Sequence, residues 1–70
     1  MPQTFTALTF KRGDWWIGWI EEVAGVNAQE RTREELLQSL RLVLREALEF
    51  NRAEAIEAAG EHYEEEAVTL

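Results

Sequence analysis

The 70-residue sequence contains no cysteine, one proline and one histidine. Without cysteine the chain has no disulfide framework, no thiolate metal site and no thiol nucleophile. It also lacks a Walker loop and a G-x-G-x-x-G motif, and we expect no cofactor. Its apolar runs fall well short of the roughly 18 residues of a membrane span, and its first residues lack the pattern of a signal peptide, which together predict a cytoplasmic protein.

What the sequence does contain suits one small folded domain. Hydrophobic residues make up 46% of the chain and charged residues 30%, proportions typical of globular rather than disordered proteins. The length predicts a single domain over residues 1–70. Because a core of this size is only marginally stable alone, we expect copies of the chain to share a packed surface in a dimer or tetramer.

The first third of the chain predicts an antiparallel β-hairpin. Residues 4–10 are rich in β-branched and aromatic side chains, which favour a strand, and Gly13 supplies a tight turn. Residues 15–20 predict a second strand whose side chains alternate between two faces. Because both faces are apolar, we expect one to lie under a helix and the other under a second copy. The faces comprise Trp16, Gly18 and Ile20 on one side and Trp15, Ile17 and Trp19 on the other.

The middle of the chain predicts a short strand at residues 26–29 and then a long amphipathic helix. Thr32 and Glu35 have the spacing of a capping box, in which the hydroxyl accepts from the amide three residues on and the glutamate reaches back. Leu42 projects opposite the apolar stripe of this helix and Phe50 lies at the edge of the stripe, so both are surplus to a one-sided core. The stripe, which is expected to cover the sheet, consists of Leu36, Leu37, Leu40, Val43, Leu44, Ala47 and Leu48, and all of these except Leu37 are expected to be buried.

The pattern leaves the end of the helix open. The helix can stop at Asn51 or continue as far as Gly60. Residues 62–70 are interpreted as a last strand, with an acidic tail as the alternative. The predicted fold class is therefore α+β, a two-layer β-β-β-α-β domain with a small antiparallel sheet and one long helix packed on one face. The candidate oligomer interface consists of Trp15, Trp16, Trp19, Leu42 and Phe50.

Negative charge is concentrated towards the C-terminus. The chain has a net charge of −7, and residues 52–70 contain one basic and six acidic residues, or −5 of that total. Such a balance repels a phosphate backbone, so we expect no direct binding of nucleic acid and instead a basic protein partner. The alternative is that the acid serves only solubility. The candidate partner-binding residues are Glu61, Glu64, Glu65 and Glu66.

One cluster near the C-terminus combines imidazole with carboxylates. On a strand, His62, Glu64 and Glu66 would share a face that can ligate a metal ion. A lone histidine beside glutamates is far more often a solvated edge, because catalytic zinc sites bring several ligands from separate elements. We therefore predict no metal site here.

Two features of the hairpin also suggest chemistry. Asp14, Glu21 and Glu22 bracket the second strand and would suit acid/base work or magnesium, although acids are common at turns and strand exits for structural reasons. The tryptophans beside Lys11 and Arg12 suggest a base-stacking surface, but two cations are few for a groove that follows a nucleic-acid backbone. We therefore predict no catalytic residues and expect the tryptophans to serve a core or an interface.

The order of these residues resembles the HicB family of antitoxins over roughly residues 5–51. The resemblance lies in the segment 13–29, Gly-Asp-Trp-Trp-Ile-Gly-Trp-Ile-Glu-Glu-Val-Ala-Gly-Val-Asn-Ala-Gln, in Thr-Arg-Glu-Glu-Leu at 32–36 and in the leucine-rich helix. In that family a hairpin leads through a Pro-Gly turn and a short strand into a T-x-E-E-A helix. Ala24 stands where the family usually has proline, and Glu30 lies near the position of a common glycine.

The resemblance implies a trimmed ribonuclease H-like fold without catalysis, which self-associates and blocks a small basic HicA-type mRNA interferase. Full-length members usually append a DNA-binding segment, and because the segment after Asn51 is acidic overall and too short for one, we expect no direct operator contact. The first hypothesis is thus a non-enzymatic antitoxin-like module. Two alternatives stay open: a divergent metal-dependent nuclease of RNase H-like ancestry, and a homo-oligomeric structural or small-ligand domain without a toxin partner.

Overall fold

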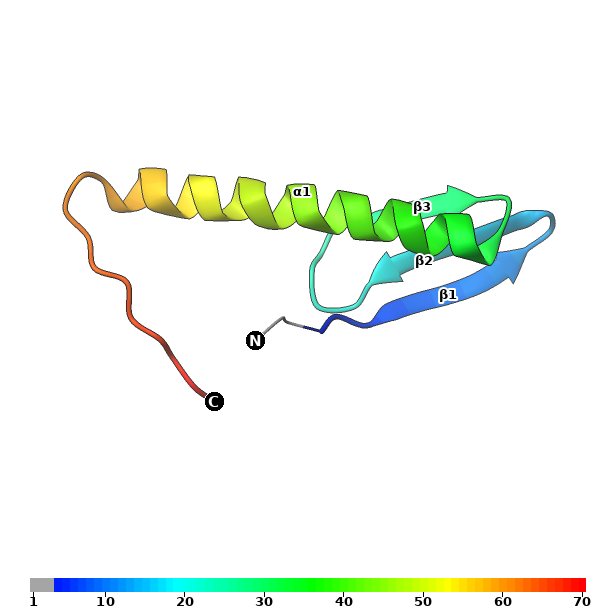
Figure 1. The fold of residues 1–70 in the computed structure, drawn as a ribbon, viewed down its shortest axis with the longest axis horizontal. Helices are drawn as coiled ribbons and strands as arrows, with labels where there is room; N and C mark the ends of the chain where they lie inside the picture. Colours follow the sequence, from blue (N-terminus) through cyan, green and yellow to red (C-terminus); the bar gives the residue numbers. More distant parts are fainter. Residues whose placement is uncertain (1–3) are drawn as a thin grey trace.

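A computed structural model of the chain describes residues 4–70. Within that range it contains three strands and one helix, in the order β1 (Ala7–Arg12), β2 (Trp15–Ile20), β3 (Asn27–Glu30) and α1 (Arg33–Ala59). The strands form one antiparallel sheet with β2 in the middle, and α1 lies across one face of it (Figure 1). This two-layer arrangement confirms the predicted α+β class.

The hairpin forms around Gly13, whose φ of 62° is the left-handed conformation that the tight turn requires. β1 runs on to Arg12, which pairs with Trp15, whereas the sequence predicted a strand over residues 4–10. Thr6 lies outside the strand, yet its carbonyl accepts a 2.9 Å hydrogen bond from the Glu21 amide and so stays tied to the end of β2. The predicted bounds of β2 are confirmed.

β3 begins and ends one residue later than predicted, and Val26, which precedes it, contributes to the core. The Val26 side chain is only 2% exposed, and its carbonyl accepts a 3.0 Å hydrogen bond from the Ile20 amide. Pairing then runs from Asn27 opposite Trp19 to Glu30 opposite Trp16. The loop between β2 and β3 is therefore held in place by Val26, through its buried side chain and its hydrogen bond to Ile20.

The start of α1 is capped as the sequence predicted. The Thr32 hydroxyl oxygen accepts a 3.1 Å hydrogen bond from the Glu35 amide, and the Glu35 carboxylate reaches back to accept a 2.9 Å hydrogen bond from the same hydroxyl. One turn later, the Ser39 hydroxyl donates a 2.7 Å hydrogen bond to the Glu30 carboxylate on β3. The first two turns of the helix are thus fixed both to their own cap and to the sheet.

The core lies between α1 and the face of β2 that carries Gly18 and Ile20. Leu36 and Leu40 are 0% and 1% exposed and pack with Ile20 and Val26. Gly18 makes this close approach possible, because a Cβ at that position would lie 3.2 Å from Leu36 Cδ2. Of the remaining stripe residues, Val43, Leu44 and Ala47 are partly buried against this core, and Leu37 and Leu48 are also partly buried.

α1 is longer than the sheet that it covers. Its 27 residues span about 40 Å, so its C-terminal half projects beyond the strands (Figure 1). Past Leu48, every helical residue except Ile56 is exposed. The helix ends at the cap residue Gly60, which decides between the two ends that the sequence allowed.

The predicted fourth strand is wrong. Residues 61–70 contain no strand and are exposed along their whole length. Because α1 delivers the chain to a point beyond the end of the sheet, no strand edge lies beside the residues that follow Gly60 (Figure 1). The observed order is β-β-β-α with a C-terminal tail, the alternative that the sequence left open.

Candidate protein-interaction surfaces

The face of the sheet opposite α1 is left uncovered by residues 4–70. Large apolar side chains are exposed on it: Leu8 is 42%, Trp15 36% and Trp19 44% exposed. The strand register places Leu8 beside Trp19 and Phe10 beside Ile17, so these side chains form one continuous apolar layer. This outer sheet face consists of Leu8, Phe10 and Arg12 on β1, Trp15, Ile17 and Trp19 on β2, and Asn27 and Gln29 on β3.

Two arginines lie against aromatic rings of the outer sheet face. The Arg31 guanidinium carbon is 4.1 Å from the centroid of the Trp15 ring, and that of Arg12 is 5.1 Å from the Phe10 centroid. Phe10 in turn meets Trp19 edge to face, with 5.4 Å between ring centroids. Such cation–π and edge-to-face contacts favour defined ring orientations. The outer sheet face is therefore an ordered aromatic surface with a cationic end near the β1–β2 turn.

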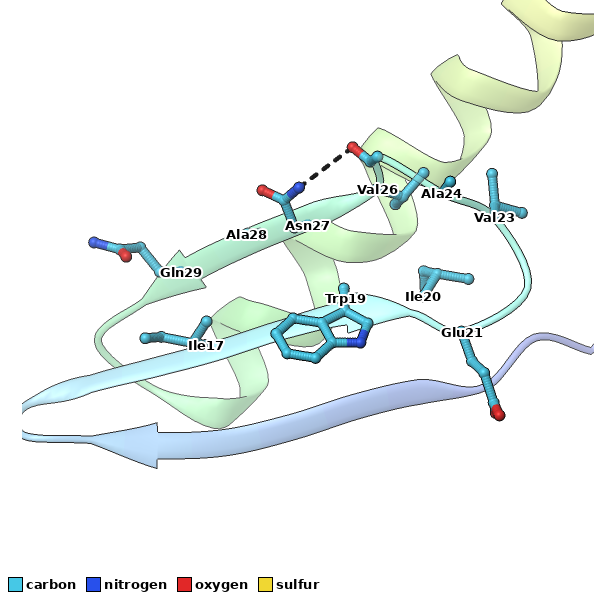
Figure 2. A pocket seen from close by; sticks show the side chains of 11 residues that line it. Ile17, Trp19, Ile20, Glu21, Val23, Ala24, Val26, Asn27, Ala28 and Gln29 are labelled. Carbon is cyan, nitrogen blue, oxygen red and sulfur yellow. Dashed lines mark hydrogen bonds between the residues drawn. The ribbon is translucent and has the colours of Figure 1, made fainter.

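An open hollow adjoins the outer sheet face where β2 turns towards β3. It has a volume of about 520 Å³ and is lined by both strands and by the loop that joins them. Figure 2 shows Ile17 and Trp19 on its β2 side and Gln29 on its β3 side. Glu21 is the one charged residue in the lining. The hollow therefore suits an apolar or aromatic side chain better than a charged substrate.

The five residues predicted for an oligomer interface lie in three different places. Trp15 and Trp19 lie on the outer sheet face. Trp16 lies on the opposite face of β2 and is partly buried against the core. Leu42 and Phe50 lie on α1, where they are 56% and 63% exposed. A single interface on the outer sheet face would thus include only two of the five.

The predicted partner-binding glutamates lie in the tail that follows α1, and all four are exposed. One of them, Glu65, forms an ion pair with Arg52 on α1 at 3.1 Å. Because both side chains are more than half exposed, this pair adds little stability. The other three, Glu61, Glu64 and Glu66, leave an acidic surface clear of the core.

The structure separates the carboxylates that a nuclease site would need. Asp14 lies in the β1–β2 turn, whereas Glu21 and Glu22 follow the other end of β2, roughly 20 Å away along the strand. The Glu22 carboxylate accepts a 2.8 Å hydrogen bond from the Thr6 amide, and this bond lowers the pKa of Glu22 below its ordinary value. Glu22 therefore serves to tie the segment before β1 to the loop after β2.

The candidate metal cluster of the tail does not gather on one strand face. His62, Glu64 and Glu66 lie in a segment without regular structure. Across residues 4–70, no three histidine or carboxylate side chains are placed to hold a metal ion.

The one helix in that range is too polar to cross a membrane.

The sequence did not single out Asn27 and Gln29 of the outer sheet face, or Arg31 beside it. Arg31 follows β3 directly and comes to lie over Trp15, while Asn27 and Gln29 present their side chains beside those of Trp19 and Ile17. The available signal was the alternation of side chains along the strand predicted at residues 26–29. Alternation alone does not identify the tryptophan beside Arg31, because that requires the register between β2 and β3.

Comparison with known proteins adds no family to these observations. No protein-family model, curated protein or solved structure matches the chain. The resemblance to HicB antitoxins therefore stays a prediction, and the functional interpretation depends on the surfaces described above.

Proposed function

We propose that the chain is a non-enzymatic interaction module, similar to a HicB antitoxin, that binds and neutralises a small basic HicA-type mRNA interferase. The observation that carries this proposal is the acidic extension, defined as residues 52–70. It projects beyond the sheet (Figure 1) and bears a net charge of −5. A charged surface held apart from the core is available to a partner without any unfolding of the domain.

The dipole of α1 adds to the negative potential of the carboxylates in the acidic extension. Glu54 and Glu57 lie in the last two turns, and the last turn contains no basic residue. The unpaired carbonyls of a helix C-terminus carry partial negative charge, so these glutamates and the helix dipole repel one another in the free protein. A cationic partner surface would relieve that repulsion.

A basic ribonuclease is a partner of suitable chemistry. An enzyme that binds an RNA backbone presents cationic side chains to it, and the acidic extension offers carboxylates to the same groups. Apolar contact is also at hand, because Ala55, Ile56, Ala59 and Tyr63 line a shallow hollow where the tail leaves the helix. Opposite charge mainly speeds the encounter, while buried apolar contacts supply affinity.

The nuclease alternative has less support than the interaction module. Asp14 and Glu21 lie at opposite ends of β2, so they do not form a carboxylate pair within one chain. Titration of the full chain with Mg²⁺ or Mn²⁺ distinguishes the two hypotheses, because a nuclease site binds the ion and a binding module does not.

The experiment is a pull-down with a HicA-like protein from the same genome, followed by stopped-flow association at low and high salt. Replacing Glu61, Glu64, Glu65 and Glu66 with glutamine should lower the association rate about tenfold at low salt and flatten its salt dependence. The fold should persist, because all four side chains are exposed.

A matched control changes the same net charge elsewhere on the surface. The four substitutions Asp14→Asn, Glu34→Gln, Glu46→Gln and Glu49→Gln also remove four exposed carboxylates, none of them in the acidic extension. They should slow association much less. The proposal fails if no complex forms, or if the rate responds equally to both sets of substitutions.

A further inference from the structure

The molecule exposes far more surface than a compact chain of its mass. Its accessible surface is 6136 Å², whereas a folded monomer of 8.1 kDa exposes about 4,500 Å². Its radius of gyration is 15.3 Å, against about 11 Å for a compact domain of 70 residues. The surplus of about 1,600 Å² is twice what each partner buries in a standard protein interface. Both the acidic extension and the exposed apolar side chains of the outer sheet face contribute to this surplus.

We propose that the outer sheet face binds a second copy of this chain, with the two sheets face to face and their β2 strands antiparallel. This inference goes beyond the proposed function, which concerns the acidic extension, and does not depend on a toxin. Stacked sheets lie about 10 Å apart with their strands aligned within about 30°. A two-fold axis between the sheets then allows two arrangements, with the axis either along β2 or across it.

Charge distinguishes the two arrangements. With the axis along β2, the end that carries Arg12 and Arg31 meets the same end of the other copy, and the four guanidinium groups face one another. With the axis across β2 at Ile17, the arginine end instead meets the end of the other copy that carries Trp19 and Glu21. Like charges across an interface cost free energy, whereas the second arrangement brings opposite charges together. The antiparallel dimer is therefore favoured.

The antiparallel arrangement also fills the hollow beside Trp19. Trp15 and Trp19 lie on the same face of β2, two residues on either side of Ile17. An axis across β2 at Ile17 therefore places Trp15 of the second copy over Trp19, at the mouth of the hollow in Figure 2. A tryptophan seated in a hollow near the centre of an interface is a typical anchor. Its contact with Arg31 orders the ring before binding, which lowers the cost of association.

Sedimentation equilibrium of the full chain tests the interface. We expect a dimer of twice 8.1 kDa at micromolar concentration. Leu8→Arg should raise the dissociation constant at least about tenfold, because it replaces an apolar contact and faces Arg12 of the second copy. Leu42→Arg is the matched control, since Leu42 is even more exposed but lies on α1, and it should leave the dimer intact. A monomeric wild-type chain, or an equal effect of both substitutions, would overturn the proposal.

The sign of the charge at position 8 tests the orientation. In the antiparallel dimer Leu8→Glu should weaken association less than Leu8→Arg, because Arg12 of the second copy pairs with the new carboxylate. With the axis along β2, position 8 faces Asn27 and the two substitutions should act alike. Circular dichroism of each variant confirms that the helix is retained.

Cross-linking gives an independent measure of the orientation, since the chain has no cysteine of its own. In the antiparallel dimer, Cα8 of one copy lies about 10 Å from Cα12 of the other, whereas two copies of the same position lie about 17 Å apart. A bis-maleimide that spans about 10 Å should therefore join a mixture of Leu8→Cys and Arg12→Cys chains faster than either variant alone. Equal rates for the mixture and the separate variants would refute the antiparallel arrangement.

Discussion

Gly18→Ala should destabilise this fold, because it adds a methyl group where β1, β2 and α1 meet. The added Cβ would lie 2.8 Å from the Leu8 carbonyl oxygen and 3.2 Å from both Leu36 Cδ2 and Thr9 Cγ2. The two side-chain contacts can relax by small rotations. The contact with Leu8 involves the backbone of the neighbouring strand, which is held in register with β2. Relief therefore requires β1 and β2 to move apart locally.

The expected cost follows from overpacking of a well-ordered core. Insertion of a methyl group where the backbone must move costs about 2–3 kcal/mol, out of the about 4–10 kcal/mol that stabilises a domain of 70 residues. With an m-value near 1 kcal/mol/M for a chain this small, the urea midpoint should fall by about 2 M. The melting temperature should fall by about 10–20 °C.

Gly13→Ala provides a control in which only the backbone conformation is strained. Gly13 has a positive φ of 62°, but a Cβ there would meet nothing within 4 Å. The substitution should cost about 1 kcal/mol, less than at Gly18. Urea titrations followed by tryptophan fluorescence, at one protomer concentration, measure the unfolding midpoints of both variants. A Gly18→Ala midpoint at or above that of Gly13→Ala would refute the argument that close helix–sheet contact depends on Gly18.

Two further predictions concern hydrogen bonds. Thr32→Ala should destabilise the protein by about 1 kcal/mol in the same titration because the Glu35 amide loses its acceptor, while Thr32→Ser should retain most of the stability; equal midpoints for both variants would contradict this. The hydrogen bond from Thr6 lowers the pKa of Glu22, so its contribution to stability is present above the ordinary glutamate pKa and is lost as the pH falls through the lowered value. Glu22→Gln should therefore unfold at a midpoint that depends less on pH in the acid range, and an unchanged pH dependence would contradict the assignment.

β2 shows what the local pattern can predict. Its bounds and the division of its side chains into two faces follow from the alternation of an extended chain, which involves only neighbouring residues. The start of α1 is predicted for a similar reason, because the capping residues Thr32 and Glu35 are three positions apart. The sequence therefore already placed Trp15 and Trp19 together on one of the two faces of β2, without indicating which face lies outwards.

Contacts between distant segments determine which of the two faces of β2 is covered by α1. Trp16 and Trp19 look equivalent in the sequence, yet Trp16 faces the core and Trp19 faces outwards. The difference arises because the face of Trp16 also holds Gly18, where the missing side chain lets Leu36 approach the sheet. In the sequence alone, a glycine within a strand pattern indicates only a point at which the strand is weakened.

Apart from the fourth strand, which is absent, local patterns in the sequence correctly predict the type and order of β1, β2, β3 and α1, the apolar stripe of α1 and the concentration of charge in residues 52–70. Each of these depends on residues close together in the chain. Three features appear only in the folded chain: α1 covers the Gly18 face, Arg31 lies over Trp15, and residues 61–70 do not join the sheet. These outcomes depend on close packing and on whether a free strand edge lies within reach, and both are properties of the whole folded chain.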